Sequence, residues 1–111
     1  MNKERRRTPR YPFAGSIEMQ LDSSQDTRTA KVSELSFNGC FVRMKEPYPV
    51  GTPLNVKVYT DSEFFEGHAN VVYVKEAQGM GLQFRETKPY FVSVLRRWIL
   101  SAMMSRRADK S

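Results

Sequence analysis

The first feature of this chain that could support chemistry is an RRxxxR motif near the amino terminus, with fixed positions Arg5, Arg6 and Arg10. A guanidinium group presents N–H donors in a planar fork, which matches phosphate oxygens and the acceptor edge of guanine. Two prolines interrupt this basic stretch, so residues 1–12 are predicted to form an extended basic arm. Taken alone, the same arm is also typical of a solvated tail that binds polyanions loosely.

A second motif, Glu34-x-Ser36-x-x-Gly39, places a carboxylate and a hydroxyl around a tight turn. Both groups can accept hydrogen bonds from a base, and the hydroxyl can also donate one. Without the arginines, this segment is interpreted as a hairpin in which Ser36 bonds its own turn and Gly39 supplies a positive φ. The Asn38-Gly39 dipeptide favours such a hairpin. With the arginines, the two motifs indicate one pocket for a small, doubly phosphorylated guanine ligand.

The elements that position these motifs are predicted from apolar residues that recur at every second position. The predicted strands cover approximately residues 13–21, 27–35, 40–44, 54–59, 64–75 and 80–84. Brief polar turns join them with no helix between, which favours an antiparallel sheet closed into a barrel. The predicted fold class is therefore all-β, a six-stranded antiparallel β-barrel followed by a C-terminal α-helix.

The predicted helix begins near Pro89, because proline is tolerated in a first helical turn. One apolar stripe with helical spacing comprises Phe91, Val94, Leu95, Trp98 and Ala102. This stripe predicts that the helix covers the barrel and buries Trp98, while Arg96 and Arg97 point away. Residues 13–105 are therefore assigned to the barrel and helix, and residues 106–111 to a frayed tail.

The order of the two motifs, their spacing and the strands between them resemble the PilZ domain family, receptors for the bacterial messenger cyclic di-GMP. The resemblance spans nearly the whole chain, from the arginine motif to the C-terminal helix. It implies that the arginines bind phosphate and guanine, that the acidic residue and serine read guanine's donor edge, and that the glycine lets the ligand approach. The ligand-binding residues that follow are Arg5, Arg6, Arg10, Glu34, Ser36 and Gly39.

Glu34 is a departure from the family pattern, which usually has Asp or Asn at this position. Glutamate keeps both acceptor oxygens but adds one methylene, which displaces the carboxylate by roughly 1–1.5 Å. The longer side chain could still accept from guanine after a change of rotamer. It could instead pair with an arginine of the arm and hold the empty site closed.

The composition limits the cellular setting. With 111 residues the chain is long enough for one domain, and its net charge of +6 attracts anions of several kinds. No apolar run reaches the roughly 18–20 residues that span a bilayer, and no signal-peptide core follows the amino terminus. The single cysteine, Cys40, suits a reducing compartment. We therefore expect a cytoplasmic protein with no membrane partner, present as a monomer or weak homodimer.

Catalysis and metal binding have little support in the sequence. His68 and Cys40 could form a dyad, but a surface histidine and a core cysteine are the more ordinary interpretations. No Cys/His cluster and no GxxxxGK phosphate-binding loop is present. The Gly79-Met80-Gly81 segment is interpreted as the start of a strand. No enzyme activity, cofactor, metal or catalytic residue is expected.

The predicted receptor orders its arginine arm over cyclic di-GMP and signals to an unidentified protein partner. One alternative is a degenerate PilZ-like domain that acts only through protein contacts. Another is a small basic barrel that binds single-stranded nucleic acid. The residues that would then stack on bases are Tyr11, Phe13, Tyr59 and Tyr73. The sequence lacks basic residues interleaved with aromatic residues on one strand face, so nucleic acid is not the expected partner.

Overall fold

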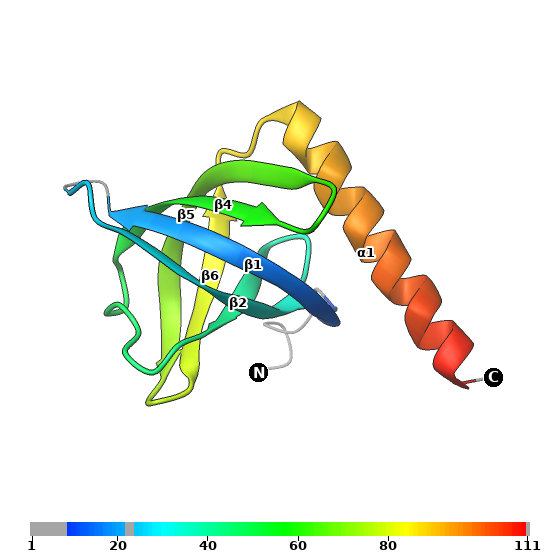
Figure 1. Cartoon of the computed structure of the whole chain (residues 1–111), viewed down its shortest axis with the longest axis horizontal. Helices are drawn as coiled ribbons and strands as arrows, with labels where there is room; N and C mark the ends of the chain where they lie inside the picture. The colour runs from blue at the N-terminus through cyan, green and yellow to red at the C-terminus, as the bar shows by residue number, and fades with distance from the viewer. Residues whose placement is uncertain (1–8, 22–23, 111) are drawn as a thin grey trace, which may run out of the picture.

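The computed structural model describes residues 9–21 and 24–110. Within these ranges the chain forms six strands followed by one helix (Figure 1). The elements are β1 (Tyr11–Leu21), β2 (Thr27–Leu35), β3 (Gly39–Arg43), β4 (Pro53–Tyr59), β5 (Phe64–Lys75), β6 (Gly79–Arg85) and α1 (Pro89–Lys110). β1 begins earlier than the predicted start at Phe13, and α1 continues beyond its predicted end near Ser105.

The strands close into an antiparallel barrel in the order β1-β2-β3-β6-β5-β4. Most neighbours in this order are also consecutive in the sequence. The two exceptions are the pairing of β3 with β6 and the pairing of β1 with β4, which closes the barrel. Side chains alternate between the interior and the outer surface of this barrel, since Val56 and Val58 of β4 are buried while Asn55 and Lys57 remain partly exposed. The predicted all-β fold, a six-stranded barrel with a C-terminal helix, is confirmed.

The helix α1 runs diagonally beside the barrel and packs against β1 and β5 (Figure 1). Val94, Leu95 and Trp98 of the predicted stripe are buried, and Ile99 joins them. The Trp98 ring lies 5.2 Å from the ring of Phe13, measured between centroids. The predicted burial of Trp98 is therefore confirmed. Among the described residues, no helix combines the length and apolarity needed to cross a membrane.

The prediction that Arg97 points away from the barrel is wrong, although its side chain is 55% exposed. Its Nη2 donates to Oε2 of Glu63, which lies in the turn between β4 and β5. The other carboxylate oxygen of Glu63 accepts from Nε1 of Trp98 at 3.1 Å. Arg97 directly precedes the buried Trp98 in the sequence, and its long side chain can reach the turn between β4 and β5. Arg96 is exposed, as predicted.

Candidate functional site

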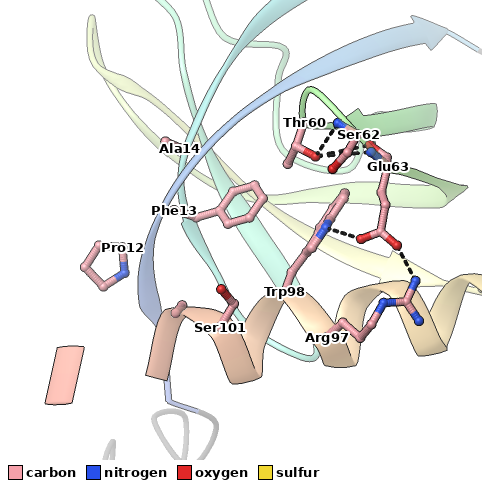
Figure 2. Close-up of a pocket in the computed structure, with 10 residues that line it drawn as sticks. Pro12, Phe13, Ala14, Thr60, Ser62, Glu63, Arg97, Trp98 and Ser101 are labelled. Carbon is pink, nitrogen blue, oxygen red and sulfur yellow. Dashed lines mark hydrogen bonds and ion pairs between the residues drawn. The ribbon is translucent and has the colours of Figure 1, made fainter. Parts of the chain in front are cut away.

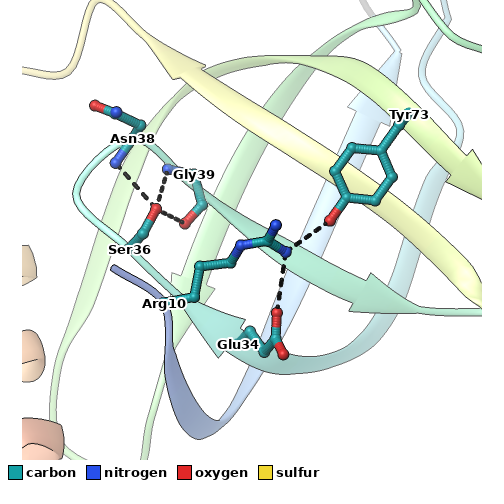
Figure 3. A network of polar contacts seen from close by, with 6 residues as sticks. All are labelled: Arg10, Glu34, Ser36, Asn38, Gly39 and Tyr73. Atoms are coloured by element: carbon teal, nitrogen blue, oxygen red, sulfur yellow. Dashed lines mark hydrogen bonds and ion pairs between the residues drawn. The ribbon is translucent and has the colours of Figure 1, made fainter. Parts of the chain in front are cut away.

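Arg10 lies just before β1 and projects over the outer wall of the barrel (Figure 3). Its Nη1 donates to Oε1 of Glu34 on β2 at 3.3 Å and to the hydroxyl of Tyr73 on β5 at 3.1 Å. The arginine motif and the second motif are therefore brought together in the described structure through Arg10 and Glu34. Arg5 and Arg6 lie outside the described residues.

The register of four strands explains why these side chains meet. Glu34 pairs with Phe41 of β3, Phe41 pairs with Gly81 of β6, and Gly81 pairs with Tyr73 of β5. Directly paired residues project to the same face of a sheet. Glu34 and Tyr73 therefore end the same row on the outer wall, and their side chains converge on Arg10 across β3 and β6.

The ion pair between Arg10 and Glu34 is open to solvent. The side chains are 41% and 46% exposed, respectively. A pair in this setting contributes roughly 0–1 kcal/mol, because water screens the attraction and two long side chains lose freedom. The contact therefore holds Arg10 over the barrel only weakly, and an anionic ligand can compete for its guanidinium group. Of the two alternatives for Glu34, pairing with an arm arginine is present in this structure.

Ser36 lies at the turn between β2 and β3, and its hydroxyl faces the turn itself (Figure 3). The side-chain oxygen accepts from the backbone N–H groups of Asn38 and Gly39 at 3.2 and 3.1 Å. The hydroxyl also donates to the Gly39 carbonyl at 3.3 Å. These bonds use its one donor and both acceptor sites. In this structure Ser36 therefore fixes the shape of the turn and presents no free hydroxyl to a ligand.

Gly39 is required by close packing of two strands, and the predicted positive φ is wrong. Neither Asn38 nor Gly39 has a positive φ. A Cβ atom at Gly39 would instead lie 1.8 Å from the carbonyl oxygen of Leu82 on β6. The turn propensity of the Asn38-Gly39 dipeptide could not reveal this contact, because the contact depends on the pairing of β3 with β6. Gly39 thus sets the spacing of the strands beneath the site.

We predict that Gly39→Ala destabilises the barrel by about 1–3 kcal/mol or more, because the added methyl group must displace backbone rather than a side chain. The free energy of unfolding in urea measures the effect. Gly67→Ala is the matched control, since a Cβ there meets the Thr87 hydroxyl oxygen at an ordinary 3.4 Å. Equal stability of the two variants would show that the approach of β3 to β6 is not constrained at Gly39.

Of the three residues Arg10, Glu34 and Tyr73 that meet on the outer wall, Tyr73 belongs to neither motif. Its only predicted role is in the nucleic-acid alternative, as one of several aromatic residues that would stack on bases. Its position on β5 is far from both motifs along the chain, and only the barrel register brings it to Arg10. The irregular register between Val71 and Tyr73 also disturbs the simple alternation from which a strand's exposed face is predicted.

A hollow of about 550 Å³ lies between α1, the start of β1 and the turn between β4 and β5 (Figure 2). Phe13 and Trp98 form its apolar wall, and Glu63 with Arg97 forms a polar rim. Glu63 is already bonded to both Trp98 and Arg97. The four predicted ligand-binding residues that the structure describes, Arg10, Glu34, Ser36 and Gly39, do not line this hollow. The contacts of Glu63 with Arg97 and Trp98 link α1 to the turn between β4 and β5.

The candidates for catalysis have ordinary surroundings. Cys40 is buried, and burial raises the pKa of its thiol to about 12. The thiol is therefore protonated at neutral pH, whereas a cysteine nucleophile must be a thiolate. His68 is exposed on β5. Across the residues that the structure describes, no group of three or more His, Cys, Asp or Glu side chains could hold a metal ion.

The comparisons with known proteins agree with this fold. The family model of the PilZ domain matches residues 4–101. Since the match covers most of the chain, this chain belongs to the PilZ domain family. PilZ domains are a class of ligand-binding receptor domains. A search of curated proteins finds no match.

Solved structures with the same fold include the PilZ domain with c-di-GMP of YcgR from Escherichia coli. The two chains share 18% identity with a TM-score of 0.76, over 96% of this chain and 99% of that one. The longer YcgR in complex with c-di-GMP from Escherichia coli gives 21% identity and a TM-score of 0.79, over 96% of this chain and 50% of that one. The Bacillus subtilis inhibitor of motility, MotI/DgrA, shares 16% identity with a TM-score of 0.78. That match covers 92% of this chain and 53% of the other. This chain thus spans about half the length of the last two proteins.

Proposed function

We propose that this chain is a receptor domain for cyclic di-GMP. The observation that supports the proposal best is the position of Arg10, whose guanidinium group stands over the outer barrel wall and touches Glu34 of the second motif. A forked cation and a carboxylate at one exposed site suit a ligand that carries phosphates and guanine N–H groups. Two solved structures of YcgR from Escherichia coli, which have the same fold, contain this ligand.

In the proposed mechanism Arg10 leaves its weak contacts and donates to the ligand. Arg5 and Arg6 complete the set of cations, and the arm becomes ordered over the ligand at an entropic cost that charge-assisted bonds offset. Glu34 accepts from the guanine N–H groups, while Ser36 and Gly39 hold the turn beside it. The ordered arm then presents a changed surface to a protein partner. No bond is made or broken, so the proposed role requires no catalytic residue, cofactor or metal.

The proposed setting is the cytoplasm, with the domain as a monomer or weak homodimer. Isothermal titration with cyclic di-GMP, with GTP and single-stranded DNA as controls, tests the ligand. We expect saturable binding of cyclic di-GMP that is stronger than that of either control. Binding of the DNA with a steep salt dependence would favour the nucleic-acid alternative. Absence of binding to all three would favour the degenerate domain that acts through protein contacts.

Glu34 is predicted to contribute to affinity even though it competes for Arg10. Removing the carboxylate gains at most the weak surface pair, roughly 0–1 kcal/mol, but loses a charge-assisted bond to guanine, about 1.5–3 kcal/mol. Glu34→Ala should therefore weaken cyclic di-GMP binding at least about twofold, and about twentyfold at the middle of these ranges. Glu34→Asp should tighten it, because the shorter carboxylate restores the residue type usual at this family position. Tighter binding by Glu34→Ala in the same titration would instead show that Glu34 acts as a clamp.

A further inference from the structure

The Gly79-Met80-Gly81 segment forms the first part of β6 and has a role beyond beginning a strand. A Cβ atom at Gly81 would lie 2.2 Å from Cε2 of Tyr73, and its three nearest atoms all belong to that ring. A Cβ atom at Gly79 would lie 2.1 Å from the backbone oxygen of Val42 and 2.8 Å from Cε2 of Phe41. The two aromatic rings therefore occupy the space that side chains of β6 would fill on the outer wall.

Phe41 and Tyr73 lie on either side of Gly81 in the strand register. Their ring centroids are 6.1 Å apart and their planes differ by 23°, so the rings are nearly parallel. Both residues are partly exposed, while the glycines between them are buried. We call this pair of rings, lying over Gly79 and Gly81, the aromatic shelf.

Cationic and hydrogen-bonding groups border the aromatic shelf. Nη1 of Arg10 lies 3.1 Å from the Tyr73 hydroxyl, which joins the shelf directly to the contact between Arg10 and Glu34. Nζ of Lys75 lies 5.6 Å from the centroid of the Phe41 ring. A flat apolar surface with cations at its edge suits a base that is attached to a phosphate, because the base can stack while the phosphate meets the cations.

We propose that the aromatic shelf is the surface on which a purine base of the ligand stacks. This inference rests on the proposed function, and the ligand used to test it is cyclic di-GMP. The shelf and Glu34 have different tasks. Stacking recognises the face of a base and tolerates either purine, whereas a carboxylate accepts from the N–H groups that distinguish guanine. The shelf therefore supplies affinity, and Glu34 supplies the preference for guanine.

A purely structural role makes a different prediction. Aromatic residues beside a strand glycine can stabilise a sheet by covering the exposed backbone. In that case, loss of a ring lowers the melting temperature and leaves ligand affinity unchanged. Leucine keeps an apolar cover over the glycines but removes the flat π-face, so it separates the two roles.

Titration calorimetry of Phe41→Leu and Tyr73→Leu tests the proposal. Each variant should bind cyclic di-GMP about tenfold more weakly than the wild type, the loss expected for one stacking contact. Tyr73→Phe keeps the ring and loses only the hydroxyl, so its affinity should fall less than about fivefold. The matched control is Phe64→Leu, which removes a partly exposed ring near the opposite end of β5 and should leave affinity unchanged.

A spectroscopic measurement reports stacking without relying on affinity. In the proton NMR spectrum of the wild-type complex, the H8 resonance of a stacked guanine should shift upfield. The cause is the ring current of the aromatic side chain beneath the base. Tyr73→Phe should retain the shift and Tyr73→Leu should reduce it. Gly81→Ala should also reduce it, since the new methyl group displaces the Tyr73 ring while both rings remain in the protein.

The outcomes separate this inference from the function on which it rests. A wild-type domain that does not bind cyclic di-GMP overturns both. A wild-type domain that binds, with neither leucine variant weakened, overturns the aromatic shelf alone. If the leucine variants fail to fold, the wild-type spectrum decides, because an H8 proton without an upfield shift in the bound state also overturns the proposal.

Discussion

Trp98→Ala is expected to lower the free energy of unfolding by about 3–5 kcal/mol, a large share of the stability of a small domain. Trp98 is only 7% exposed, and its ring packs against Phe13 and Phe65 with centroids 5.2 and 5.8 Å away. Alanine would leave a cavity between the helix and the barrel. It would also remove the indole donor to Glu63, whose carboxylate would keep its contact with Arg97.

Urea unfolding followed by far-ultraviolet circular dichroism measures this loss. Fluorescence is unsuitable because Trp98 is the single tryptophan of the chain. The control is Trp98→Phe, which keeps most of the apolar contact and loses the hydrogen bond, and it should cost less than half as much. A loss below about 1 kcal/mol for Trp98→Ala would indicate that α1 contributes little to folding, because surface substitutions commonly fall in that range.

Arg10→Ala is expected to weaken cyclic di-GMP binding by about tenfold or more, since each charge-assisted contact contributes roughly 1.5–3 kcal/mol. The melting temperature should change little, because Arg10 is exposed and its ion pair with Glu34 is a surface contact. Titration calorimetry and thermal unfolding on the same samples separate the two effects.

Arg10→Lys is the control for charge, because lysine keeps the cation and loses the planar fork. It should bind better than Arg10→Ala and less well than the wild type. Arg6→Ala should also lose at least about tenfold if Arg6 binds the ligand with Arg10. Unchanged affinity in both alanine variants would overturn the proposed site. An equal, graded loss for any removed cation, with a steep salt dependence, would favour nucleic-acid binding.

The sequence by itself determined the number and approximate bounds of the strands, the presence of the helix and the stripe that the helix buries. The predicted bounds of β2 and β5 agree with the structure, because alternation of apolar residues is a local pattern that records which side of a strand meets the core. The apolar stripe of the helix correctly predicted the burial of Trp98, because helical spacing of apolar residues is also a local pattern. The resemblance to a known family also rested on motifs that are contiguous in the chain.

Only the tertiary structure decided which side chains from different strands meet. The row from Glu34 through Phe41 and Gly81 to Tyr73 depends on β3 pairing with β6 and on barrel closure. The same pairing places Gly39 against β6. Periodicity along one strand gives the face of each residue but not its partner on the next strand. That partner is fixed by register, which the closed barrel sets through many weak contacts at once.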